Sequence, residues 1–146
     1  MKTSIATVSI SGDFAEKLQA IADARFDGIE IFEQDFISSD LNPADISKMV
    51  QGHGLEITLF QPFRDFEGLP AGPLRQRAFS RAERKFELMN QLGTDLMLVC
   101  SSLHPACLGG IDRCAQDFAE LGAILYDDFR YNEIVTVRCC RSRRHH

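Results

Sequence analysis

Apolar and polar positions along the chain repeat with two different periods. Short apolar or β-branched runs predict four strands, at Ser4–Ser9, Gly28–Phe32, Leu55–Phe60 and Leu96–Cys100. Longer segments between these runs carry apolar residues at a spacing of three and four, which is typical of helices that bury one face. Gly28–Phe32 is almost entirely apolar, so it is expected to be covered on both faces, as in a parallel sheet.

Four helices are predicted after the strands. Asp13 can cap the first, whose apolar face includes Phe14, Leu18 and Ile21. Asn42 precedes the second, which has Pro43 at its first helical position. The remaining two helices are predicted at Leu74–Leu92 and Ile111–Leu125.

The alternation of strand and helix indicates an α/β fold with parallel strands joined by helical crossovers. Four β/α units match half of a (β/α)8 TIM barrel, whose usual length is about 250 residues. A small open sheet of the flavodoxin type is the alternative. No glycine-rich phosphate loop follows the first strand, and polar residues follow several strands; both features favour the incomplete barrel. We assign it to residues 1–129 and treat 130–146 as a separate tail.

Composition narrows the class of protein. The chain has 146 residues, of which 45% are hydrophobic and 25% charged, with a net charge of -5. These values are typical of one globular domain with a packed core, and the negative charge argues against nucleic acid or an anionic membrane as partner. Thr3, Ser4 and Thr7 interrupt the start, where a signal peptide needs an apolar run, so the expected location is cytoplasmic. The five cysteines show no metal-type spacing and are expected to be reduced.

The tail at 130–146 differs from the rest of the chain. It holds five arginines and one glutamate and has no periodic apolar face. We expect it to be disordered or non-native, for instance the product of a shifted reading frame. A nucleic-acid-binding arm is the alternative that its charge suggests.

The candidate substrate contacts follow the third and fourth strands. Ligands meet parallel α/β folds at the carboxyl ends of the strands, where Gln61, Arg64 and His104 are expected. Arg64 either binds substrate or pairs with Asp65 or Glu67 as a surface arginine. Gln61 either hydrogen-bonds a substrate hydroxyl or satisfies backbone groups of the loop.

Two carboxylates belong to the second strand. Glu33 lies at its exit and faces either the site or solvent. Glu30 lies inside it, where a lone buried carboxylate would be costly, so a structural hydrogen bond within the barrel is expected. The charges of Arg81–Glu87 are expected on the solvated outer face of a helix.

Four segments resemble a known family. They are SIATVSISG (Ser4–Gly12), ARFDGIEIFEQD (Ala24–Asp35), LEITLFQPFRDFEG (Leu55–Gly68) and RAERKFELMNQLGTDLMLVCSS (Arg81–Ser102). In this order they resemble the xylose-isomerase-like TIM barrels of the sugar phosphate isomerase/epimerase superfamily. Within it they are most similar to the amino-terminal half of bacterial 3-dehydroshikimate dehydratases.

The resemblance implies a hydro-lyase chemistry. Members of this family convert 3-dehydroshikimate to protocatechuate by loss of water, in quinate and shikimate catabolism. A divalent metal (Mg, Mn or Co) would stabilise the enolate that forms when a proton leaves the carbon beside a carbonyl. Arg64 suits the carboxylate of such a small hydroxy acid, because its planar fork pairs with two oxygens.

The resemblance also implies that the metal ligands are missing from this chain. The first, a glutamate after the fifth strand, would fall near position 135, which is Val135 here, with Glu133 the nearest carboxylate. The flanking residues do not match, so we expect no metal ligand and no activity from this chain alone. An inactive half-barrel from a truncated or frame-shifted gene is the first alternative, and a sugar phosphate isomerase or epimerase is the second. A half-barrel would expose strand edges that favour self-association.

Overall fold

The computed structural model describes residues 1–129 and 138–140. By its internal contacts the chain divides into two units. The first unit comprises Met1–Pro62 and Leu88–Met97, and the second comprises Phe63–Glu87 together with the chain from Leu98 onward. Val135 and Glu133, the positions considered above for a metal ligand, lie outside the described residues.

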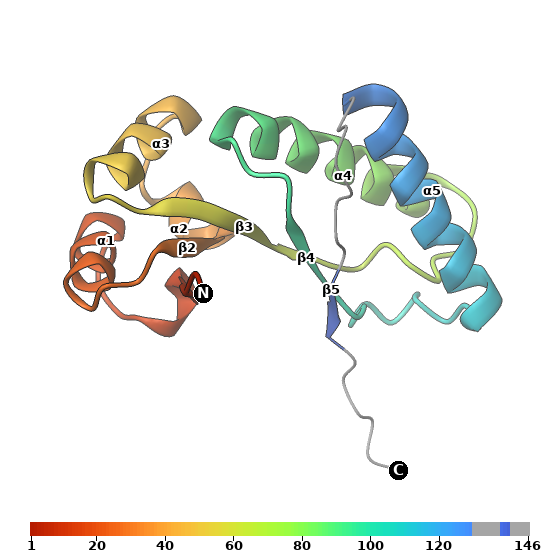
Figure 1. The fold of residues 1–146 in the computed structure, drawn as a ribbon. Coiled ribbons are helices and arrows are strands. Elements are labelled where there is room, and N and C mark those ends of the chain that lie inside the picture. Colours follow the sequence, from red (N-terminus) through yellow and green to blue (C-terminus); the bar gives the residue numbers. More distant parts are fainter. Residues whose placement is uncertain (130–137, 141–146) are drawn as a thin grey trace, which may run out of the picture. The chain divides into compact units, whose positions relative to one another are not determined.

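The strands form one sheet in the order β1-β2-β3-β4-β5. They are β1 (Ser4–Ala6), β2 (Gly28–Phe32), β3 (Glu56–Phe63), β4 (Met97–Cys100) and β5 (Arg138–Cys140). The β1–β2, β2–β3 and β4–β5 pairs are parallel. Helices alternate with the strands along the chain (Figure 1). This arrangement confirms the predicted fold class, a partial TIM barrel with parallel strands.

Local sequence signals explain the helices of the first unit. Helix α1 (Phe14–Asp23) begins with a capping box, in which Asp13 and Glu16 each accept a hydrogen bond from the other's backbone N–H. Helix α3 (Pro43–Gly52) begins after Asn42, whose side chain accepts from the backbone N–H of Asp45. Their apolar faces pack with β2 and β3, and the fully buried side chains include Leu18, Ile29, Ile31, Ile46, Val50 and Phe60.

Two parts of the first unit differ from the prediction. The strand predicted at Ser4–Ser9 ends at Ala6, and Thr7–Ser9 form a 3-10 turn. Buried Thr7 draws the chain inward there, since its hydroxyl accepts a hydrogen bond of 3.0 Å from the Phe32 backbone N–H. A short helix, α2 (Glu33–Ser38), was not predicted. It is tied to α1 by the buried ion pair between Lys17 and Asp35, at 2.8 Å, a tertiary contact with no local sequence signal.

The second unit is built around aromatic rings. The remaining helices are α4 (Pro73–Leu92), which contributes residues to both units, and α5 (Ile111–Phe129). Phe66 stacks on Phe63 with ring centroids 5.0 Å apart, and it meets Phe79 and Phe118 edge-on. These rings attach the loop after β3 to α4 and α5. In the described part of the chain, no helix has the length and apolar character needed to cross a membrane.

Candidate functional site

Gln61 occupies a buried position in β3, not a loop as predicted, because the strand continues to Phe63. Its side chain is 8% exposed, and its amide nitrogen donates to Glu30 Oε2 at 3.0 Å. The pairing register sets Glu30 opposite Leu59, two residues before Gln61, so both side chains lie on the same face of the sheet. Glu30 is thereby hydrogen-bonded within the first unit, while no described residue bonds to the side-chain oxygen of Gln61.

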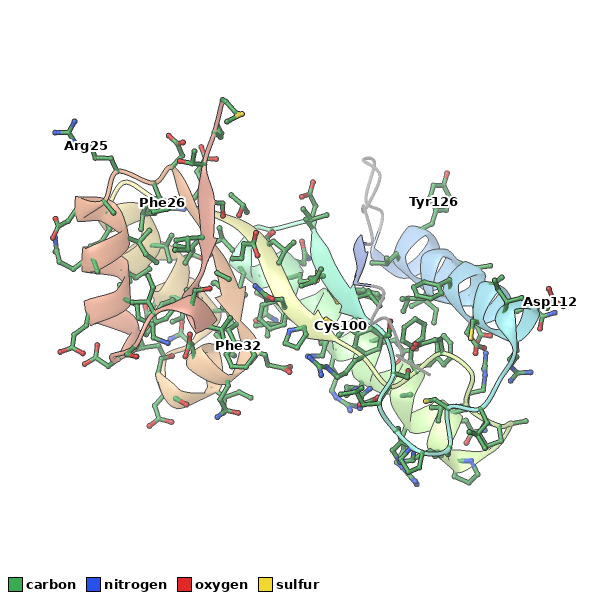
Figure 2. The ribbon with its side chains drawn as sticks, turned by 90° about the horizontal axis from the view of Figure 1, so that it is seen from below. Arg25, Phe26, Phe32, Cys100, Asp112 and Tyr126 are labelled. Carbon is green, nitrogen blue, oxygen red and sulfur yellow. The ribbon has the colours of Figure 1, made fainter. Side chains whose placement is uncertain are left out.

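Glu33 follows β2 directly and is the first residue of α2. It is half-exposed. The strand that precedes it is fastened to the carboxyl end of β1 by the bond from the Phe32 N–H to Thr7. Figure 2 shows Phe32 at this end of β2. The polar side chains with hydrogen bonds near these strand ends of the first unit include Thr7, Glu30 and Gln61.

Arg64 is the first residue after β3 and belongs to the second unit. Its side chain is half-buried and makes no hydrogen bond or ion pair with any described residue. Neither Asp65 nor Glu67, the partners that a surface arginine would use, is paired with it. An unengaged guanidinium at the end of a parallel strand is the feature of this unit that suits an anionic ligand.

Asp65 and Glu67 instead hold the loop after β4. Asp65 Oδ1 accepts from the backbone N–H of Leu103 at 2.6 Å and of His104 at 3.0 Å. Glu67 accepts from the backbone N–H of Ser102 at 2.7 Å and from its hydroxyl. Two carboxylates thus bind three successive residues of the neighbouring loop, which brings the loops after β3 and β4 together within the second unit.

His104 is exposed on that loop. Its Nδ1 accepts from the backbone N–H of Ala106 at 3.1 Å, so the ring is oriented by its own loop. Its backbone N–H shares Asp65 Oδ1 with Leu103. The structure therefore brings His104 and the Arg64–Asp65 segment into one cluster, while Gln61, Glu30 and Glu33 belong to the first unit.

Arg81 is a residue of this cluster that the sequence did not reveal, since the whole Arg81–Glu87 run was assigned to a solvated face. That assignment is wrong for Arg81, which is half-buried, and for Lys85, which is 5% exposed. Arg81 donates to the backbone carbonyls of Arg64 and Asp65. Helical spacing contained a signal, because position 81 lies one turn from the buried residues Ala78 and Lys85.

A second polar network supports the middle of the loop after β3. Asp117 is completely buried and accepts from the Gly68 N–H at 2.8 Å and from Arg75 at 2.6 Å. Arg75 also donates to Glu120 at 3.0 Å. The hydrogen bond from Arg75 holds the pKa of Glu120 below its usual value, and the same two carboxylates raise the pKa of Arg75. This network fixes Gly68, in the middle of the loop that begins with Arg64.

Cys107 and Cys114 of the second unit are free thiols. Cys107 and Cys114 are half-buried, and burial raises the pKa of both thiols above the ordinary value. Nearby carboxylates, Glu67 foremost, act in the same direction. Raised pKa values keep these groups in the unreactive thiol form at neutral pH.

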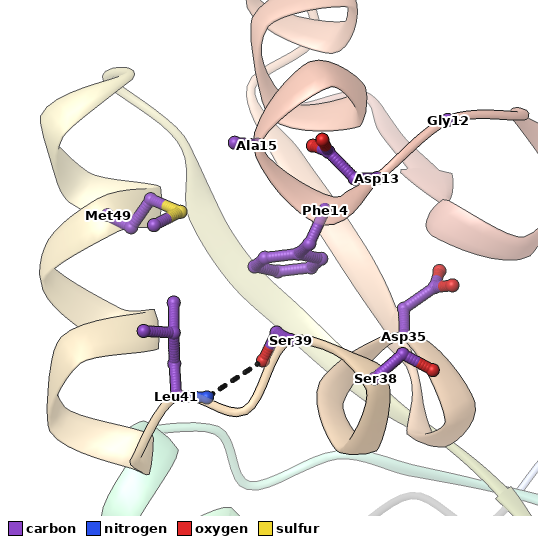
Figure 3. Close-up of a pocket in the computed structure, with 9 residues that line it drawn as sticks. All are labelled: Gly12, Asp13, Phe14, Ala15, Asp35, Ser38, Ser39, Leu41 and Met49. Carbon is purple, nitrogen blue, oxygen red and sulfur yellow. Dashed lines mark hydrogen bonds between the residues drawn. The ribbon is translucent and has the colours of Figure 1, made fainter.

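A cavity of about 340 Å³ lies elsewhere in the first unit, between the start of α1 and the α2–α3 segment (Figure 3). Phe14, Leu41 and Met49 form its apolar side. Its polar side chains are already engaged, Asp35 with Lys17 and Ser39 with the backbone of Phe36 and Leu41. We therefore place the candidate site at the strand ends and not in this cavity.

The described residues do not fit a divalent metal. No group of three or more His, Cys, Asp or Glu side chains among them is arranged to hold an ion. Among the carboxylates near the strand ends, Asp65 and Glu67 accept from backbone N–H groups and Glu30 accepts from Gln61.

Comparison with known proteins identifies the family of the chain. A sequence model of the xylose isomerase-like TIM barrel family matches residues 18–129. The chain belongs to this family. It is 54% identical over 121 residues to the 3-dehydroshikimate dehydratase of Pseudomonas aeruginosa, and 52% identical over 122 residues to that of Pseudomonas putida.

These alignments cover 83% and 84% of the chain but only 19% of each relative. The chain thus spans about a fifth of the length of the dehydratases it matches. A solved xylose isomerase-like TIM barrel/4-hydroxyphenylpyruvate dioxygenase fusion protein superposes with a TM-score of 0.79 at 50% identity, over 84% of this chain and 20% of that one. The resemblance inferred from the four sequence segments is confirmed at the level of the family.

Proposed function

We propose that this chain provides the first strands and part of the substrate-binding wall of a 3-dehydroshikimate dehydratase. The observation that carries the proposal is the side chain of Arg64. It is half-buried at the end of β3 and unengaged among the described residues, while both neighbouring carboxylates are occupied by the loop after β4. The similarity to two curated dehydratases supports the choice of substrate.

The proposed substrate offers groups that match these side chains. Its carboxylate would accept two parallel hydrogen bonds from the Arg64 guanidinium, the strongest geometry available to such a pair. The side-chain oxygen of Gln61, whose nitrogen is committed to Glu30, would accept from a substrate hydroxyl. We propose Glu33 and His104 as further substrate contacts, and Glu30 as the structural partner that orients Gln61.

Loss of water from a hydroxy ketone needs a base for the proton beside the carbonyl and an acid for the departing hydroxide. The described residues supply binding and orientation. The divalent metal that the family resemblance implies does not fit them, and we propose that its ligands lie on strands other than those described. We further propose that the 146-residue chain binds the substrate but does not convert it.

Two measurements on the purified chain test this proposal. Calorimetric titration with 3-dehydroshikimate is expected to give saturable binding, and titration with a ketose phosphate is expected to give none. The opposite preference would favour the sugar phosphate isomerase reading. Incubation with 3-dehydroshikimate and Mg²⁺, Mn²⁺ or Co²⁺ is expected to leave the ultraviolet absorbance of protocatechuate at the level of a metal-free control. Growth of that absorbance would overturn the statement that the chain alone is inactive.

A further inference from the structure

We infer that Arg81 is a positioning residue for Arg64: from α4 it holds the backbone segment that aims the Arg64 guanidinium at an anionic ligand. The inference rests on the proposed function for the identity of that ligand. The contacts that carry it all lie within the second unit.

The contacts of Arg81 are directed at the residues on both sides of the Arg64 side chain. Its Nη2 donates to the backbone carbonyl of Arg64 and, at 3.2 Å, to that of Asp65. Its guanidinium carbon lies 5.3 Å from the centroid of the Phe63 ring, within the range of a cation–π contact. Arg81 thus touches three consecutive residues, with Arg64 in the middle.

The residues on either side of Arg64 are restrained independently of Arg81. Phe63 is fully buried and stacks on Phe66. Asp65 has a φ of 62°, a left-handed conformation that is uncommon for a residue with a side chain. Its carboxylate is bonded to the N–H groups of Leu103 and His104. Arg64 therefore lies between a buried aromatic residue and a hydrogen-bonded turn. Arg81 adds a hydrogen bond to the backbone carbonyl of Arg64 itself.

Arg81 and Arg64 have different roles in this inference. Arg81 commits its Nη2 to two backbone carbonyls and lies over the Phe63 ring, so this nitrogen is not available to an anion. The Arg64 side chain has no such commitment among the described residues. A guanidinium whose backbone is already ordered loses less conformational entropy when it binds a carboxylate. Arg81 would therefore raise affinity without contacting the ligand.

A double-mutant cycle separates this role from simple stabilisation of the fold. The Kd for 3-dehydroshikimate would be measured for the wild-type chain, Arg81→Met, Arg64→Met and the double variant. Arg81→Met is expected to weaken binding by about fivefold to tenfold in the wild-type background, the equivalent of one or two hydrogen bonds. In the Arg64→Met background it is expected to change the Kd by less than about twofold, because the group that it positions is gone.

Equal losses in both backgrounds would overturn the inference, since they would mean that Arg81 acts on the fold as a whole. Arg84→Met is the matched control, because Arg84 is exposed on the same helix, and it is expected to leave the Kd unchanged. Arg81→Lys keeps the charge but cannot reach both carbonyls with a planar fork. Arg81→Lys replaces Arg81→Met in the cycle if the Met variant does not fold. Its loss of affinity is again expected only in the chain that retains Arg64.

A readout without ligand keeps this inference distinct from the proposed function. The backbone amide order parameter of Arg64, from ¹⁵N relaxation, is expected near 0.85 in the wild-type chain and lower in Arg81→Met. Unchanged order would show that Arg81 does not hold the segment, whatever the chain binds. If the wild-type chain fails to bind 3-dehydroshikimate while order falls in the variant, the substrate assignment is wrong and the positioning contact stands.

Discussion

Gly68 and Gly109 meet backbone to backbone. The amide nitrogen of Gly109 donates to the carbonyl oxygen of Gly68 at 3.0 Å, and a Cβ placed on Gly109 would come within 2.6 Å of the Gly68 Cα. This contact joins the middle of the loop after β3 to the segment that leads into α5. Together with the bond from Gly68 to Asp117, it fixes the loop that starts at Arg64 four residues after its first position.

Gly109→Ala is expected to destabilise the second unit, because the added methyl group meets rigid backbone and one of the two segments must shift. Strain of this kind costs about 1–3 kcal/mol in the free energy of unfolding. Gly110→Ala is the control, since a Cβ at Gly110 meets nothing within 4 Å. Urea unfolding followed by circular dichroism measures both variants, and equal stabilities would contradict the close approach.

Asp117→Ala is expected to be among the most destabilising single changes. The substitution removes the acceptor for the Gly68 N–H and one partner of Arg75, whose Nε is itself buried without a hydrogen-bond partner among the described residues. Removing one partner from a buried network of this kind costs about 3 kcal/mol. Asp112 projects outward from the same helix (Figure 2), and Asp112→Ala is expected to cost less than about 1 kcal/mol. Thermal unfolding distinguishes the two.

The pair between Arg75 and Glu120 predicts a small dependence of stability on pH. The hydrogen bond from Arg75 lowers the pKa of Glu120 in the folded state. The contribution is therefore complete above the unfolded-state pKa of about 4.3 and is lost as the pH falls through the lower folded-state value. The Glu120 side chain is 47% exposed, so solvent screening keeps the effect under about 1 kcal/mol.

Glu120→Gln is expected to be less stable than the wild-type chain near pH 6.5. The two are expected to be equally stable at a pH low enough to protonate the wild-type Glu120 carboxyl in both the folded and the unfolded state. Denaturant midpoints across this pH range provide the measurement. Glu83→Gln, at an exposed position on α4, is the control. A difference between wild type and Glu120→Gln that grows toward low pH would contradict the direction of the pKa change.

The elements with local signals were predictable from sequence. Gly28–Phe32 forms β2 with the predicted bounds, because a short β-branched and aromatic run, interrupted only by Glu30, predicts a strand. Helix α1 begins where Asp13 indicated, through the capping box with Glu16. These signals depend on neighbours within one turn or one strand, which the sequence contains in full.

Features that depend on distant partners were not predictable. The 3-10 turn after β1 depends on a hydrogen bond that Thr7 accepts from the Phe32 N–H, 25 positions further along the chain. In the sequence, Arg81 has the pattern of a surface charge. Its hydrogen bonds to the carbonyls of Arg64 and Asp65 are known only from the structure. Arg64 and His104 were proposed from their place after strands. That they share a cluster, joined by the Asp65 carboxylate, required the fold.

The most direct test of this account is the Kd of 3-dehydroshikimate for the wild-type chain, Arg64→Met and Arg77→Met, measured by calorimetry at low ionic strength. Arg77 is exposed on α4 and controls for the loss of one positive charge. Arg64→Met is expected to weaken binding at least tenfold, which corresponds to about 1.4 kcal/mol, while Arg77→Met leaves the Kd within about twofold of the wild-type value. Equal affinities for the wild-type chain and Arg64→Met would contradict the assignment of Arg64 to the substrate carboxylate.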